Sequence, residues 1–106
     1  MNFIVIGKDK GNLRAARRPA HLDYIAERQH QILYAGPLIE EGRMIGSLFV
    51  FDVPDRAALD DYLAGDPSFA DGGIFAHVEI YESRKMVPEA EPGFLRAEAQ
   101  RARETV

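Results

Sequence analysis

The order of strand-like and helix-like segments between Phe3 and Glu82 constrains the fold of this chain more than any other feature. Four runs are rich in β-branched or aromatic residues and end at glycine, proline or a polar turn, which is typical of strands. These runs are Phe3–Gly7, Gln31–Leu38, Met44–Val53 and Ile74–Glu82. Helical spacing of apolar residues follows the first run and the third. The order βαββαβ predicts a ferredoxin-like α+β fold, with a four-stranded antiparallel sheet and two helices on one face.

Proline, capping and glycine signals set the expected helix boundaries. Pro19 suits the first turn of a helix, so we expect a loop through residues 14–18 and a helix that carries His21 close to its N-terminus. Asp55 is the expected N-cap of the second helix, and Gly65 its expected end.

Both faces of the predicted sheet carry apolar side chains. Alternation separates Ile4 from Phe3 in the first strand, and Val50 from Phe49 in the third. Two helices cover only one face of such a sheet. We therefore expect the aromatic-rich face to be covered by the sheet of a second copy, which predicts a homodimer.

Length and composition limit the remaining possibilities. The chain has 106 residues, enough for one core, and we expect a domain over residues 1–87 followed by an extension, 88–106, with a short helix from Phe94 to Thr105. Without cysteine there is no disulfide and no thiolate metal site. A net charge of −4 disfavours nucleic acid as a partner. The apolar start is too short for a signal peptide or a membrane span, so we expect a cytoplasmic protein.

His21 and Asp66 are the strongest candidates for chemistry. Each is a lone titratable residue close to a proline at the expected edge of a helix. Taken singly, the histidine fits a solvent-facing or capping residue and the aspartate fits a turn starter. If the fold brings them together, the carboxylate would orient one imidazole nitrogen and leave the other to move a proton.

A basic segment surrounds this candidate pair. Residues 8–18 hold five cationic side chains and one acidic side chain, Asp9. The cationic residues are Lys8, Lys10, Arg14, Arg17 and Arg18. A solvated mobile loop is one interpretation; the other is a patch that attracts a small anion, with Arg18 the nearest to His21. Ser47 is a candidate polar contact.

The other histidines have weaker functional signals. His30 ends the expected first helix, where an imidazole favours the C-terminal dipole, so we expect a capping role for it. His77 lies in the last strand on the side expected to face the partner. No two histidines have the short spacing typical of metal ligands, so we expect no metal.

Several short motifs together resemble the YciI-like (YCII-related) family over residues 1–87. They are Arg18-Pro19-x-His21-Leu22, Ala35-Gly36-Pro37-Leu38, Gly46-Ser47, Asp66-Pro67-Ser68-Phe69 and Gly72-Gly73-Ile74-Phe75. The resemblance implies a dimeric α+β barrel with catalytic His21 and Asp66, and a serine-containing strand that matches Ser47. We expect the substrate to contact Arg18, Ser47, Gly36, Pro37 and Phe69. Ser68 stands where many relatives have an aromatic residue directly after proline, so the resemblance is weaker for the floor of the pocket than for the His21 and Asp66 pair.

The family includes a dehydrochlorinase that acts on a chlorinated hydroxyquinol, which implies cofactor-free proton transfer on small oxygenated rings. We therefore expect a cofactor-free enzyme of the lyase or isomerase type, acting on a small anionic or oxygenated ring. Two alternatives stay open: a non-catalytic dimeric module that binds a metabolite, and a cofactor-free monooxygenase of the same barrel superfamily. RNA binding is disfavoured because the central strands lack a motif of stacked aromatic and basic residues.

Overall fold

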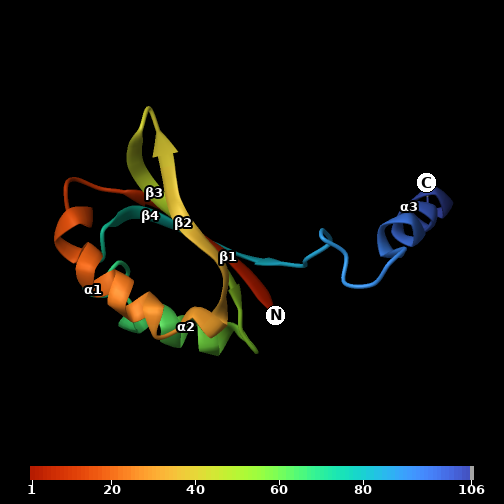
Figure 1. Ribbon diagram of the computed structural model, residues 1–106, viewed down its shortest axis with the longest axis horizontal. Coiled ribbons are helices and arrows are strands. Elements are labelled where there is room, and N and C mark those ends of the chain that lie inside the picture. The colour runs from red at the N-terminus through yellow and green to blue at the C-terminus, as the bar shows by residue number, and fades with distance from the viewer. Residues whose placement is uncertain (106) are drawn as a thin grey trace.

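The chain folds as a four-stranded antiparallel sheet with two helices on one face and a third helix at its C-terminal end (Figure 1). The computed structural model describes residues 1–105. Its elements are β1 (Asn2–Asp9), α1 (Arg14–Ala26), the 3-10 turn η1 (Gln29–Gln31), β2 (Ile32–Glu40), β3 (Arg43–Asp52), α2 (Arg56–Gly65), β4 (Phe75–Ser83) and α3 (Phe94–Glu104). The strand order β2-β3-β1-β4 confirms the predicted ferredoxin-like α+β fold.

The first helix begins earlier than predicted. α1 starts at Arg14 and contains Pro19 in its interior, so the expected loop over residues 14–18 is wrong. Proline removes one helical hydrogen bond, but Arg14 and Arg17 are anchored to other parts of the fold, and these contacts stabilise the first turns. His21 therefore lies in the middle of α1, beyond the first turn in which the helix dipole acts strongly.

The boundary signals at the second helix are confirmed. The Asp55 carboxylate accepts a hydrogen bond from the backbone N–H of Ala58 at 2.9 Å, and α2 ends at Gly65. Glu41 and Gly42 join β2 to β3 with positive φ angles of 51° and 77°, the backbone that a two-residue hairpin loop requires.

The register of β1 and β3 collects the aromatic side chains on the face that α1 and α2 cover. Phe3 pairs with Phe51 and Val5 pairs with Phe49, and all four side chains are buried. Leu59 of α2 packs in the same cluster. The expectation that the aromatic-rich face would be left for a second copy is therefore wrong. These large rings fill the space between sheet and helices, where they remove the most apolar surface from water.

The opposite face of the sheet, which we call the open face, has no helix over it (Figure 1). It carries Ile4, Ile6, Tyr34, Leu48, Val50 and Tyr81. Tyr34 is 58% exposed and Tyr81 is 53% exposed. The open face is thus an apolar surface without a cover from the described part of its own chain.

Residues 84–105, the C-terminal arm, extend away from the sheet and carry α3 at their far end (Figure 1). The radius of gyration is 16.7 Å, against about 13 Å for a compact domain of this length. The Glu89 carboxylate accepts hydrogen bonds from the backbone N–H groups of Gly93 and Leu95, and these bonds lower the pKa of Glu89. In residues 1–105 no helix has the length and apolar character needed to cross a membrane.

Candidate active site

The fold brings His21 and Asp66 into direct contact. The Nδ1 atom of His21 lies 2.7 Å from Oδ1 of Asp66, although the two residues are 45 positions apart in the chain. The Asp66 side chain is fully buried, whereas 8% of His21 is exposed. The pair is therefore sheltered on the aspartate side and reaches solvent on the histidine side.

Two further donors hold the Asp66 carboxylate. The backbone N–H of Ser68 donates to Oδ1 at 2.8 Å, and the Tyr62 hydroxyl donates to Oδ2 at 3.0 Å. Burial, together with the negative charge of Asp66 and this hydrogen bond, raises the pKa of Tyr62, so the hydroxyl keeps its proton. A carboxylate that receives these donors acts as an acceptor toward His21 as well. In a neutral ring with this contact, Nδ1 of His21 carries the hydrogen and Nε2 has a lone pair.

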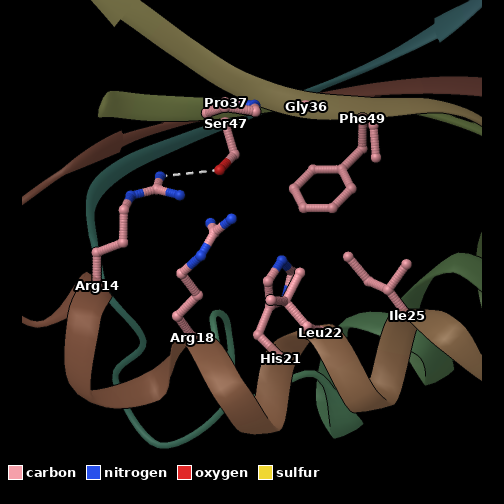
Figure 2. A pocket seen from close by; sticks show the side chains of 10 residues that line it. Arg14, Arg18, His21, Leu22, Ile25, Gly36, Pro37, Ser47 and Phe49 are labelled. Carbon is pink, nitrogen blue, oxygen red and sulfur yellow. Dashed lines mark hydrogen bonds between the residues drawn. The ribbon is translucent and has the colours of Figure 1, made fainter. Parts of the chain in front are cut away.

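The Nε2 edge of His21 faces a cavity of about 190 Å³ between α1 and the strands β2 and β3 (Figure 2). The cavity is lined by Arg14, Arg18, His21, Leu22, Ile25, Ala35, Gly36, Pro37, Ser47 and Phe49. Four of the five predicted contact residues are in this set: Arg18, Gly36, Pro37 and Ser47. Arginine and serine groups occupy one end of the cavity, and apolar side chains form the rest of the wall (Figure 2).

Phe69, the fifth predicted contact residue, does not line this cavity. Its ring packs between Phe49, at a centroid distance of 5.5 Å, and Phe75, at 5.0 Å. Phe49 forms the aromatic wall instead, and meets the His21 ring edge to face at 6.0 Å. Phe69 thus supports the wall from behind.

Arg14 is a cavity residue that sequence reasoning did not select for the site. Its guanidinium donates two hydrogen bonds to the Asp9 carboxylate, at 2.7 and 2.8 Å, and one to the Ser47 hydroxyl at 2.8 Å (Figure 2). Arg14, Arg18, His21, Leu22 and Ile25 occupy one stripe of α1 at helical spacing. That spacing was the available signal, and it was missed because the helix was expected to begin at Pro19.

The cationic side chains of the basic segment have two roles. Some hold a loop of the fold in place, and others line the cavity. Arg17 donates from Nη1 to the carbonyl oxygens of Pro67 at 2.9 Å and Ala70 at 2.7 Å. Lys10 donates to the carbonyl of Gly72 at 3.1 Å. These two cations clamp the loop that carries Asp66 onto β1 and α1. Arg18 has no oxygen acceptor among residues 1–105; its guanidinium contacts the Met44 sulfur at 3.8 Å.

The loop after Asp66 folds back through three consecutive residues with positive φ, at 53°, 84° and 59° for Asp71, Gly72 and Gly73. A Cβ at Gly73 would lie 2.5 Å from the carbonyl oxygen of Ser68, so only glycine fits there. This tight return keeps Ser68 beside Asp66, where its N–H donates to the carboxylate.

The remaining histidines lie away from the cavity. His30 is exposed on η1 rather than in the last turn of α1, which ends at Ala26, so its expected capping role is wrong. His77 lies on the open face, with Nε2 3.6 Å from a carboxylate oxygen of Glu79. Across the residues that the structure describes, no three potential metal-ligating side chains come together.

A ferredoxin-like α+β domain with a buried His–Asp pair beside a small cavity defines the class of this protein. The chain belongs to the family of the YCII-related domain, whose model matches residues 1–84. The resemblance seen in the sequence motifs is thereby confirmed.

Two solved structures share the fold. The 5-chloro-2-hydroxyhydroquinone dehydrochlorinase of Burkholderia phenoliruptrix AC1100, in complex with 2,5-dihydroxybenzoquinone, is 22% identical, with a TM-score of 0.73 over 84% of this chain and 99% of that one. An antibiotic biosynthesis monooxygenase is 15% identical, with a TM-score of 0.54 over 80% of this chain and 97% of that one. A search of curated proteins finds no match. At these identities the two structures establish the fold alone.

Proposed function

We propose that this protein is a cofactor-free enzyme of the lyase or isomerase type, in which His21 is the general base and Asp66 orients it. The observation that carries the proposal is the 2.7 Å contact between Nδ1 of His21 and Asp66, with the opposite edge of the ring facing the cavity. This arrangement leaves Nε2 able to accept a proton from a bound molecule. The buried carboxylate stabilises the imidazolium that results.

In the lyase form of the reaction, Nε2 of His21 removes a proton from the substrate. The electron pair of the broken bond forms a new π bond, and the leaving group departs with its own electron pair. The proton then passes from His21 to the leaving group or to solvent. In the isomerase form the same proton returns to another atom of the substrate, so no group is lost. Negative charge that develops on a substrate oxygen would lie near Arg18 and the Ser47 hydroxyl, which stabilise it.

The substrate that fits best is a small ring with an ionised hydroxyl or carboxylate. The cavity of about 190 Å³ is below the roughly 300–1,000 Å³ typical of drug-sized sites, so it suits a molecule of about one ring. Leu22, Ile25 and Phe49 offer the ring apolar contacts, while Arg18 attracts its charged group. The related fold that binds 2,5-dihydroxybenzoquinone supports this choice of substrate class.

We also propose that the protein acts as a cytoplasmic homodimer joined through the open face. Ile4, Leu48 and Val50 present aliphatic surface there, with the exposed ring of Tyr34 beside them. A second copy of the same face would bury this surface about a two-fold axis and complete a dimeric α+β barrel.

The test is a turnover screen with chlorinated hydroxyquinols and related ring acids, comparing wild type with His21→Ala and Asp66→Asn. We expect His21→Ala to lose about 100-fold or more in kcat, because one acid–base group contributes roughly that much. His30→Ala is the matched control, since His30 is an exposed histidine outside the cavity, and its kcat should not change.

The same screen separates the alternatives. Unchanged turnover of an accepted substrate by His21→Ala would remove His21 from the mechanism. Binding without turnover, retained in His21→Ala, would indicate a metabolite-binding module. Uptake of oxygen with a phenolic substrate would indicate a monooxygenase.

A further inference from the structure

A second cavity, of about 460 Å³, lies next to the first one and shares two of its side chains. Arg14 and Arg18 line both cavities. Arg43 and Met44, from the start of β3, line the second cavity on the side of the hairpin. The two α1 arginines therefore stand between the cavity at His21 and the second cavity.

The charge of the second cavity is unbalanced. Its one lining carboxylate, Asp9, is already held by Arg14 through two hydrogen bonds. Arg18 and Arg43 form no ion pair with any residue in the range 1–105, and the Met44 sulfur is the only hydrogen-bond acceptor of Arg18 in that range. Two cationic side chains thus face one cavity without a neutralising partner, on a chain whose net charge is −4.

Glu40 and Glu41 do not remove this imbalance. Glu40 is the cross-strand partner of Arg43 in the hairpin, and both glutamates line a separate hollow with Arg43. Neither carboxylate lies within ion-pair distance of the Arg43 guanidinium. The attraction between Arg43 and these carboxylates is exposed to solvent and screened, so it is weak. Arg43 can therefore turn its guanidinium toward an anion in the second cavity at little cost.

We propose that this second cavity is an outer subsite that binds a carboxylate at the far end of the substrate, while the reacting end lies against His21. The proposal rests on the proposed function, and it makes the substrate a small acid with two anionic groups. The planar forks of Arg18 and Arg43 suit a carboxylate, which accepts two parallel hydrogen bonds from one guanidinium.

Figure 2 shows how the two α1 arginines lie relative to His21. Arg14 and Arg18 project from α1 toward the strand that carries Ser47, between the His21 end of the site and the start of the helix. Arg14 is occupied by Asp9 and Ser47, so it forms a fixed wall. Arg18 keeps its donors for a ligand and stands where the two cavities meet.

Two probes of the same ring size test the outer subsite by titration calorimetry on the full chain. Benzoate carries one carboxylate, and terephthalate carries a second one on the opposite side of the ring. We expect wild type to bind terephthalate about three- to tenfold more tightly than benzoate, the range for one partly exposed charged contact. Arg43→Gln should abolish this advantage and leave the affinity for benzoate unchanged.

Arg96→Gln is the matched control, because Arg96 is an exposed arginine on α3, outside both cavities, and its loss should change neither affinity. Higher salt should weaken terephthalate binding more than benzoate binding. Equal affinities for the two probes in wild type, equal losses in Arg43→Gln and Arg96→Gln, or no binding of either probe would overturn the subsite. Because binding is read without turnover, and the ratio can be measured in His21→Ala as well, failure of the subsite is distinguishable from failure of the proposed chemistry.

Discussion

The two faces of the sheet are built from the same four strands and differ in what covers them. On the covered face Phe3, Phe49 and Phe51 are at most 4% exposed, under α1 and α2. On the open face Tyr34 and Tyr81 remain more than half exposed. The side chains alternate along each strand, so neighbouring residues in one strand belong to different environments.

This difference separates the residues that hold the fold together from those that are available for association. The covered face closes the core and also positions the candidate site, because Ser47 and Phe49 lie on it and form part of the cavity wall. The open face contributes little to the core of one chain. Changes to adjacent residues should therefore have separate effects on folding and on assembly.

The largest effect on folding is expected for Phe51→Ala. The Phe51 side chain is fully buried and stacks against Phe49 at a centroid distance of 5.6 Å. Its truncation should lower the free energy of unfolding by about 3–5 kcal/mol, the usual cost of removing a buried ring. Urea unfolding followed by circular dichroism measures this. Val50→Ala, one residue away on the open face, is the control, and an equal loss in the two variants would contradict the comparison.

Tyr62→Phe tests the hydrogen bond beneath the His–Asp pair. The variant removes the donor to Oδ2 of a buried carboxylate and should cost about 1–3 kcal/mol at neutral pH. The pKa of Tyr62 is raised in the folded state above its ordinary value of 10.0. The unfolded chain therefore loses this proton first, and wild type should lose stability as the pH rises above about 10.

The variant lacks this group, so its alkaline loss should be smaller and the gap between the two proteins should narrow above pH 10. Urea unfolding at several pH values provides the measurement. Tyr34→Phe, at an exposed tyrosine on the open face, is the control. A gap that stays constant or widens with rising pH would show that burial and Asp66 do not raise the pKa of Tyr62 in the folded state.

Arg17→Met tests the clamp on the loop that carries Asp66. Methionine keeps the apolar stem of the side chain but cannot donate to the carbonyls of Pro67 and Ala70. We expect a loss of about 1 kcal/mol in the free energy of unfolding and faster amide hydrogen exchange at Ser68. Arg56→Met is the control, since Arg56 pairs with Asp60 on the exposed side of α2. Unchanged exchange at Ser68 would contradict the clamp.

Much of the fold was predictable because local signals and the alternation of apolar residues agree. Asp55 marks the start of α2, and the order of strands and helices follows from the sequence. The start of α1 was not predictable, because contacts of Arg14 and Arg17 with distant residues outweigh the proline signal at Pro19. Which face the helices cover was also missed, since both faces are apolar and alternation alone does not rank them.

The His21–Asp66 pair of the candidate site was predictable from the sequence, whereas some of the contacts around the pair were not. His21 and Asp66 stood out as titratable residues near prolines, and the structure brings them within hydrogen-bond distance. The contact of Tyr62 with Asp66 comes from α2 and the return of the loop, which only the three-dimensional fold reveals. Arg14 was misplaced with the loop, so its contact with Ser47 was missed.

Val50→Lys should have the smallest effect on the folding of one chain and a decisive effect on assembly. Val50 pairs with Ile4 and Tyr34 on the open face, where a lysine can extend its ammonium into water. In a dimer joined through this face, the same charge would be buried opposite apolar side chains and its symmetry copy.

Analytical ultracentrifugation measures the result directly. We expect wild type to sediment as a dimer and Val50→Lys as a monomer with an unchanged circular dichroism spectrum. Asp61→Lys is the matched control, because Asp61 is an exposed residue of α2, on the side of the sheet opposite the open face. Monomeric wild type would mean that the open face stays in water, and the contrast between the two faces would then be one of stability alone. Dissociation by Val50→Lys but not by Asp61→Lys would instead show that the surface left uncovered by the helices is the one that assembles the protein.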